Sequence, residues 1–191
     1  MNFSEAAGII SEKIKEKAAI NKRLIVAIDG RCASGKTTLA QELCRLLDCN
    51  VIHTDDFYLQ PFQRTEERYA EPGGNLDRER LLKEVLVPLS EGRKPLYQPF
   101  DCKRICFSRA VILPEKNIYI VEGSYSCHPD LRPFYDLTAF VTSDSEVQKE
   151  RIRKRNGEEE LADFINIWIP LEEKYFETFD VEAEADIVIK T

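Results

Sequence analysis

The sequence predicts an α/β fold with a five-stranded parallel sheet that carries helices on both faces. Short apolar runs alternate along the chain with longer segments whose apolar residues recur every three or four positions. The runs lack the polar alternation of a half-exposed strand, which is typical of strands covered on both faces. Strands that alternate with helices in this way form a doubly wound sheet with right-handed crossovers.

Each predicted strand is one of these apolar runs. The first, at residues 24–28, reads Leu-Ile-Val-Ala-Ile, and the others are expected at residues 51–54, 117–121, 137–141 and 185–189. Helices are expected at residues 3–20, 38–47, 78–87, 145–155 and 160–176. We interpret residues 1–191 as a single domain, because a domain holds about 150 residues.

The composition narrows the classes of partner. Lys and Arg number 27 and Asp and Glu number 34, so the net charge is −7, and such a chain lacks the basic face that nucleic acid requires. No apolar run reaches the roughly 20 residues of a membrane span. Residues 1–5 lack the basic segment and the apolar segment with which a signal peptide begins. We therefore expect a cytoplasmic protein with no nucleic acid and no membrane as partner. None of its six cysteines is in a Cys-x-x-Cys pair, so they are expected to be reduced thiols rather than zinc ligands.

A glycine-rich motif lies between the first strand and the following helix. Residues 30–37 read Gly-Arg-Cys-Ala-Ser-Gly-Lys-Thr, a complete G-x-x-x-x-G-K-T phosphate loop. The glycines let backbone N–H groups point at a phosphate, Lys36 reaches the β- and γ-phosphates, and the Thr37 hydroxyl holds Mg²⁺. This context predicts the P-loop NTPase fold, with ATP and Mg²⁺ as cofactors. The predicted nucleotide-binding residues are Gly30, Arg31, Cys32, Ala33, Ser34, Gly35, Lys36, Thr37 and Thr38.

The phosphate loop does not fix the reaction, because GTPases, ATP-driven motors and small-molecule kinases share it. A GTPase should carry an Asn-Lys-x-Asp guanine reader after a later strand, whereas the Asn-Lys pair of this chain lies at residues 21–22, before the first strand. A motor would be larger and would carry further nucleotide-sensing elements. A kinase is therefore the leading hypothesis, and a nucleotide-binding switch without an acceptor is the alternative.

Two aspartates follow the second predicted strand. Ligands of a parallel sheet bind at the carboxyl ends of its strands, so Asp55 or Asp56 should face the terminal phosphate. A kinase uses such a carboxylate to orient the acceptor hydroxyl and to take its proton. The alternative is that Asp55 caps a helix that begins at Phe57.

A series of motifs resembles the uridine kinase family of P-loop kinases, particularly its bacterial uridine kinase-like members. In chain order they are the phosphate loop, residues 53–58 (His-Thr-Asp-Asp-Phe-Tyr), 74–77 (Gly-Asn-Leu-Asp), 121–123 (Val-Glu-Gly) and 150–155 (Glu-Arg-Ile-Arg-Lys-Arg). The resemblance spans about residues 24–190. Its Asp-x-Phe-Tyr motif is more selective than the phosphate loop, which many families share.

The resemblance implies roles for residues on the acceptor side. Asp55 would be the catalytic base, and Asp77 would bind ribose hydroxyls unless it only caps the helix predicted near residue 78. Tyr97 would stack near a pyrimidine unless it is a half-buried hairpin residue. Tyr58 and Arg109 complete the acceptor-binding candidates. The long stretch at residues 57–113 is interpreted as an acceptor-binding insertion, because a connection of that length is usually functional.

Acidic and basic residues are also expected to serve the phosphates. Glu122 ends the third strand, where P-loop families place an acid that holds Mg²⁺; the alternative is a hydrogen bond to a neighbouring loop. The basic run at residues 151–155 resembles the lid of nucleoside kinases, so a short arginine lid is expected over about residues 149–160. Arg151 and Arg155 share one helix face and would close over the phosphoryl group, unless the run is a solvated face. The predicted catalytic residues are Asp55, Lys36, Arg151 and Arg155.

The acceptor implied by the resemblance is a small nucleoside-like molecule. The first candidate is a pyrimidine nucleoside, uridine or cytidine, phosphorylated on its 5′-hydroxyl. Nucleoside-specific members carry a histidine where residues 106–109 read Cys-Phe-Ser-Arg, and a phenylalanine cannot hydrogen-bond a base edge. Other acceptors, such as pantothenate or nicotinamide riboside, therefore remain alternatives, and assembly into a homo-oligomer is left open.

Overall fold

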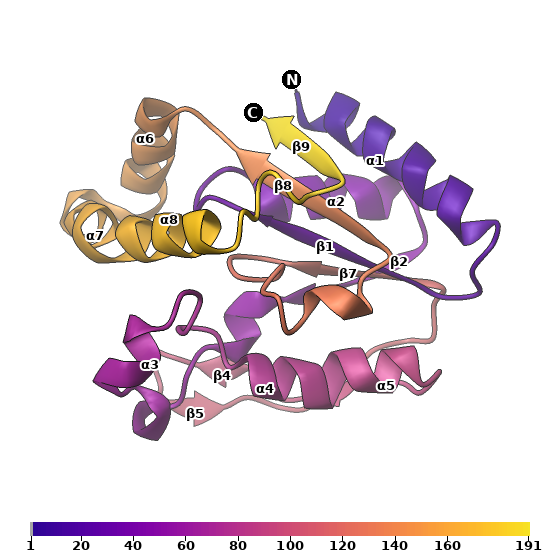
Figure 1. The fold of residues 1–191 in the computed structure, drawn as a ribbon, viewed down its shortest axis with the longest axis horizontal. Helices are drawn as coiled ribbons and strands as arrows, with labels where there is room; N and C mark the ends of the chain where they lie inside the picture. The colour runs from indigo at the N-terminus through magenta and orange to yellow at the C-terminus, as the bar shows by residue number, and fades with distance from the viewer. Residues whose placement is uncertain (1) are drawn as a thin grey trace.

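The computed structural model describes residues 2–191, and a parallel sheet lies at its centre (Figure 1). Its strands run in the order β2-β7-β1-β8-β9, and each neighbouring pair is parallel. The predicted α/β fold with a five-stranded parallel sheet is therefore confirmed. The strands are β1 (Leu24–Gly30), β2 (Cys49–His53), β7 (Ile118–Glu122), β8 (Leu137–Thr142) and β9 (Ile187–Lys190).

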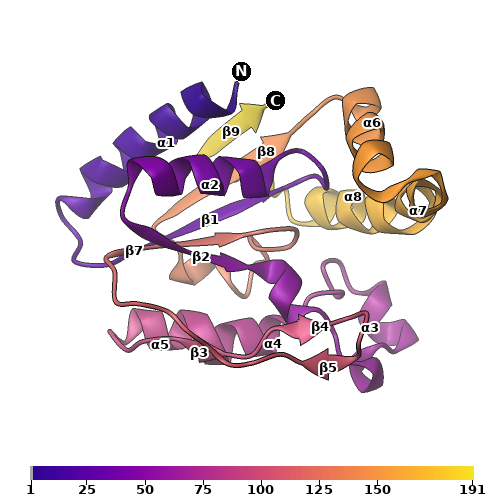
Figure 2. The same cartoon turned by 180° about the vertical axis from the view of Figure 1, so that it is seen from behind.

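Helices cover both faces of this sheet (Figures 1 and 2). Alternate residues of β1 enter two different cores: Leu24, Val26 and Ile28 pack in one, and Ile25 and Ala27 pack in the other. This alternation explains why the strand has no polar face in its sequence. The first core lies under α1 (Phe3–Ala18) and α2 (Lys36–Leu46), and the second also contains side chains of the segment between β2 and β7.

The segment between β2 and β7 contains more regular structure than the sequence predicts. One continuous helical stretch runs from α4 (Arg78–Leu81) through a π-helical turn (Leu82–Leu86) into α5 (Val87–Ser90), beyond the predicted end at residue 87. It packs beside two small antiparallel ladders, shown in Figure 2. The remaining elements of this segment are 3-10 turns at Thr54–Phe57 and Pro61–Gln63, α3 (Glu66–Ala70), β3 (Leu96–Tyr97) with β6 (Val111–Ile112), and β4 (Phe100–Asp101) with β5 (Cys106–Phe107).

The C-terminal helices bring the predicted lid beside the phosphate loop. Helix α6 (Ser145–Asn156) ends at Gly157, whose φ of +90° suits glycine, and α7 (Glu158–Asp163) begins directly after it. Helix α7 continues through a π-helical turn (Phe164–Trp168) into α8 (Ile169–Thr178). Within residues 2–191, none of the helices is both long enough and apolar enough to cross a membrane.

One pair of cysteines departs from the expectation of reduced thiols. Cys44 near the end of α2 and Cys49 at the start of β2 form a disulfide. The short connection between these elements brings their Cα atoms to 5.6 Å, a separation that a disulfide can bridge. Sequence spacing does not indicate this closeness, because it depends on how α2 turns back to the sheet.

Candidate active site

The phosphate loop takes its shape from backbone conformations that favour glycine. Gly30 has a φ of +134° and Gly35 a φ of +99°. A Cβ atom at Gly30 would lie 1.9 Å from the carbonyl oxygen of Val141, and one at Gly35 would lie 2.2 Å from Cζ of Phe3. Both glycines of the motif are therefore required by close packing as well as by φ.

Lys36 is buried and held against its own loop. Its Nζ donates hydrogen bonds to the carbonyl oxygens of Gly30 (2.6 Å) and Arg31 (3.0 Å) and to Oγ of Ser124 (3.4 Å). The ammonium group thus lies inside the loop, where it could contact a phosphate group bound there.

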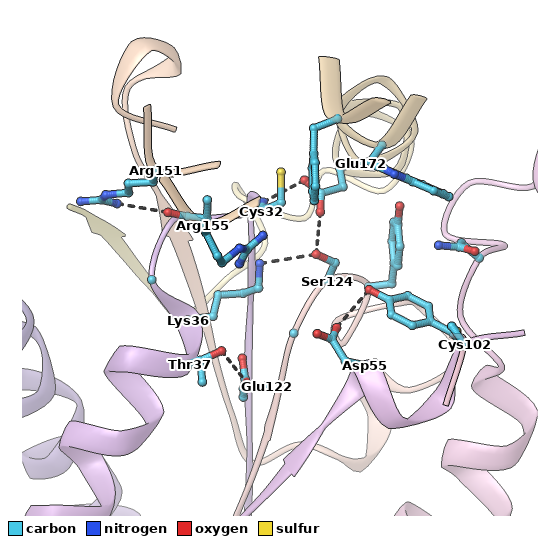
Figure 3. Close-up of a pocket in the computed structure, with 18 of the residues that line it drawn as sticks. Cys32, Lys36, Thr37, Asp55, Cys102, Glu122, Ser124, Arg151, Arg155 and Glu172 are labelled. Carbon is cyan, nitrogen blue, oxygen red and sulfur yellow. Dashed lines mark hydrogen bonds between the residues drawn. The ribbon is translucent and has the colours of Figure 1, made fainter. Parts of the chain in front are cut away.

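A cavity of about 740 Å³ opens beside the loop (Figure 3). Its walls come from the phosphate loop, the ends of β2 and β7, and helices α6 and α8. The structure therefore brings together most of the residues predicted for nucleotide, metal and catalysis. Those that line the cavity are Cys32, Ala33, Gly35, Lys36, Thr37, Thr38, Asp55, Tyr58, Glu122, Arg151 and Arg155.

The two aspartates after β2 point in different directions. Asp55 is exposed to the cavity, and one of its carboxylate oxygens accepts a hydrogen bond from the Tyr58 hydroxyl at 3.0 Å. Asp56 instead hydrogen-bonds the Tyr97 hydroxyl, and burial raises the pKa of its carboxyl group. Asp55 is therefore the carboxylate of the pair that an incoming ligand would meet.

Glu122 lies beside Thr37, the other residue of the predicted metal site. Its Oε1 accepts a hydrogen bond from the Thr37 hydroxyl at 3.0 Å and lies 2.5 Å from Nδ1 of His53 on the neighbouring strand. The hydrogen bond to Glu122 raises the pKa of His53. Mg²⁺ binds oxygen ligands and usually takes only one or two from protein side chains, so Thr37 and Glu122 fit that ion.

Three residues predicted to bind the acceptor do not line the cavity. Asp77 is buried, and its carboxylate accepts hydrogen bonds from the Arg80 N–H (3.1 Å) and the Gln63 amide (3.0 Å), so it caps α4. Tyr97 is buried, with its ring centroid 5.1 Å from that of Phe57. Arg109 is exposed, between β5 and β6.

The arginines predicted to contact phosphates occupy different positions. Arg31 forms a two-pronged ion pair with Glu173 of α8, with N–O distances of 2.7 and 2.9 Å, and does not line the cavity. Arg151 donates to the Thr191 hydroxyl at 2.9 Å and points away from Lys36 in Figure 3. Arg155 points into the cavity in the same view. Among these three arginines, Arg155 is the one best placed to approach a phosphoryl group.

The cavity is also lined by residues that the sequence did not indicate, and one of them is a buried carboxylate, Glu172 of α8. Its side chain accepts hydrogen bonds from the backbone N–H of Cys32 (2.9 Å) and from the Ser124 hydroxyl (2.6 Å). Ser124 directly follows the Glu122-Gly123 motif, so an extension of that motif could have found it. Glu172 and Trp168 lie outside every motif.

Asp29 connects two loops of the site through hydrogen bonds to their backbone N–H groups. Fully buried at the end of β1, it accepts hydrogen bonds from three backbone N–H groups, those of Gly30 (2.7 Å), Tyr125 (3.1 Å) and Cys127 (2.8 Å). The Tyr175 hydroxyl of α8 donates a fourth hydrogen bond at 2.8 Å. Burial raises the pKa of Asp29 to about 6. The phosphate loop, the loop after β7 and α8 thus share one anchor.

Comparison with known proteins gives matches at modest identity. No protein-family model matches the chain. The chain is 26% identical to the uridine kinase of Clostridium tetani over 184 residues, which cover 87% of this chain and 86% of that protein. It is 27% identical to the uridine-cytidine kinase C of Dictyostelium discoideum over 121 residues, which cover 62% of this chain but only 27% of that longer protein.

A solved structure supports the same relationship across the whole fold. A possible uridine kinase from Bacillus stearothermophilus superposes with a TM-score of 0.74 at 25% sequence identity. The match covers 99% of this chain and 100% of the other chain. The predicted P-loop NTPase fold is therefore confirmed.

Proposed function

We propose a function on the premise that this chain is similar in fold and motifs to the uridine kinase-like P-loop kinases. The chain transfers the γ-phosphoryl group of ATP to a primary hydroxyl of a small molecule. The observation that carries this proposal is that Asp55 and Lys36 line the same cavity. Phosphoryl transfer depends mainly on positioning and charge neutralisation, and these two groups supply a partner for the alcohol and a partner for the phosphates.

Four charged side chains of the cavity, together with the Thr37 hydroxyl, have a role in this reaction. Lys36 exchanges its bonds to loop carbonyls for bonds to phosphate oxygens. Thr37 and Glu122 would hold Mg²⁺, and the ion would supply positive charge beside the phosphates. Asp55 orients the acceptor hydroxyl and takes its proton. Arg155 stabilises the charge that develops on the transferring group.

The first candidate acceptor is a pyrimidine nucleoside, phosphorylated at its 5′-hydroxyl. Two of the relatives support it, since one is named a uridine kinase and the other a uridine-cytidine kinase. The cavity also has several aromatic side chains against which a flat base could stack: Tyr58, Tyr69, Tyr125 and Trp168.

A different small acceptor, such as pantothenate or nicotinamide riboside, is the second candidate. It is favoured by the positions of Asp77, Tyr97 and Arg109, because these three of the four residues expected to bind the acceptor lie outside the cavity lining, which includes Tyr58. A nucleic-acid end is a poor third choice, since the net charge of −7 opposes binding of a polyanion.

The test is ADP release from MgATP in the presence of single acceptors. The panel contains uridine, cytidine, pantothenate, nicotinamide riboside and sugar phosphates, with Lys36→Ala as the inactive control. We expect uridine or cytidine to raise ADP release above the rate without acceptor. Acceleration by another member alone would replace the pyrimidine with that acceptor. If ATP binds and no acceptor changes the rate, the protein is a nucleotide-binding switch and the kinase proposal is wrong.

A further inference from the structure

The carboxylate of Glu172 is bound to the phosphate loop, the part of the protein that is expected to bind the phosphates of a nucleotide. Its side chain is buried, and both carboxylate oxygens are hydrogen-bonded, one by the Cys32 backbone N–H and one by the Ser124 hydroxyl. Backbone N–H groups of a phosphate loop normally point at the phosphates of a nucleotide. In this structure, one of them is already satisfied by a carboxylate from α8.

The carboxylate is also connected to the lysine that reaches the γ-phosphate. Ser124 Oγ lies 2.6 Å from Glu172 Oε1 and 3.4 Å from Lys36 Nζ, so a single hydroxyl separates the two charges (Figure 3). A γ-phosphate bound to Lys36 would therefore lie close to Glu172. Two anions at such separation in a partly desolvated cavity repel each other strongly.

A nucleoside diphosphate would not meet this repulsion in the same way, because it lacks the third phosphate. The other bonds between α8 and the loop region do not involve the cavity: Glu173 pairs with Arg31, and Tyr175 donates to Asp29. Glu172 can therefore leave the loop while α8 stays attached through its neighbours.

We propose that Glu172 is a specificity-determining residue that occupies the γ-phosphate side of the loop and competes with the third phosphate of ATP. Nucleoside triphosphate displaces the carboxylate, whereas nucleoside diphosphate leaves it in place. The inference rests on the proposed binding of ATP and adds a residue that sets the balance between ATP and ADP. That balance would determine how easily the product leaves after transfer.

The test uses Glu172→Gln in the full chain. Glutamine keeps the shape of the side chain and an oxygen that accepts from the Cys32 N–H, but it carries no charge. Calorimetric titration without acceptor should show MgATP binding tighter by about tenfold and MgADP changed by less than about twofold. The matched control is Glu177→Gln, which removes the same charge from an exposed position on α8 and should change neither affinity.

The outcomes separate this inference from the proposed function. Equal changes for ATP and ADP, or weaker ATP binding, would show that Glu172 only fastens α8 to the loop, and the inference would be overturned. If neither nucleotide binds the unmodified chain, the proposed function itself fails.

A second measurement needs no variant at position 172, in case that variant fails to fold. Trp168 is the one tryptophan of the chain, it lines the same cavity, and it precedes Glu172 by one helical turn. We expect MgATP to change its fluorescence emission and MgADP to change it much less, with Trp168→Phe identifying the signal. Identical responses to the two nucleotides would contradict displacement of Glu172.

Discussion

The two sides of the cavity are built differently. On the phosphate-loop side, the charged groups are buried and fully engaged: Asp29 accepts four hydrogen bonds, Lys36 donates three and Glu172 accepts two. On the acceptor side, Asp55 is exposed and has a hydrogen bond from Tyr58, which is only half buried. The charged groups on the phosphate-loop side are thus held by hydrogen bonds within the protein, whereas Asp55 is exposed and can meet a ligand directly. Under the proposed function, the phosphate-loop side would determine the type of reaction and the Asp55 side would determine the acceptor.

The largest effect is expected from Asp55→Asn, on the exposed side of the cavity. The variant keeps the shape of the side chain but cannot accept the proton of the alcohol, so we expect acceptor-dependent turnover to fall by about 10²–10⁴-fold. The affinity for ATP should be unchanged, because the substitution leaves the phosphate loop and its hydrogen bonds intact. Steady-state kinetics and calorimetry together measure both quantities.

Asp56→Asn is the matched control, since Asp56 faces Tyr97 rather than the cavity. If Asp55→Asn retained full acceptor-dependent turnover and Asp56→Asn lost it, the catalytic base would be Asp56. The acceptor would then bind beside Asp56 and not beside Asp55.

Gly35→Ala tests whether the phosphate loop depends on close packing and on the positive φ of Gly35. A methyl group at this position would meet the Phe3 ring at 2.2 Å in a backbone with φ of +99°, so we expect a loss of more than about 1 kcal/mol in unfolding free energy. Nucleotide affinity should fall as well. Denaturant titration and calorimetry measure these changes.

Gly8→Ala supplies the contrast, because Gly8 lies within α1 and a Cβ there would have no atom within 4 Å. This helical substitution should raise the unfolding free energy by about 0.5–1 kcal/mol. Equal effects of the two alanines would mean that the loop is not a strained, closely packed element.

Substitutions at Asp77 test whether this residue caps α4 or binds the acceptor. Asp77→Ala removes the N-cap of α4 and should lower the unfolding free energy by about 1 kcal/mol, while Asp77→Asn keeps a good cap and should cost less. The KM for the acceptor should stay nearly constant in both variants. A large rise of KM in the stable Asn variant would show instead that this carboxylate binds the acceptor, as the family resemblance implies.

The parts of the molecule that the sequence predicted are those whose shape is local. The apolar run at residues 24–28 becomes β1 with no need of distant information, and the motif at residues 30–37 specifies the phosphate loop because its glycines occupy positive-φ positions. The position of Asp55 beside the cavity was predictable for a related reason, since it lies two residues after the end of β2, at the carboxyl edge of the sheet.

The residues that sequence analysis missed depend on packing between distant segments. Glu172 contacts Cys32 across 140 positions of sequence, and no pattern in α8 marks it as a loop ligand. Asp77 illustrates a second difficulty: an aspartate before a helix has the same appearance whether it caps the helix or binds a hydroxyl. The helix after Asp77 forms, and its first turn takes up the carboxylate.

The shared anchor at Asp29 has a consequence for the slow motions of the protein. Because one carboxylate holds the amide hydrogens of Gly30, Tyr125 and Cys127, none of these amides can exchange with solvent deuterium without disturbing the others. We therefore expect the phosphate loop and the loop after β7 to open together in hydrogen exchange, even though nearly a hundred residues of chain separate them.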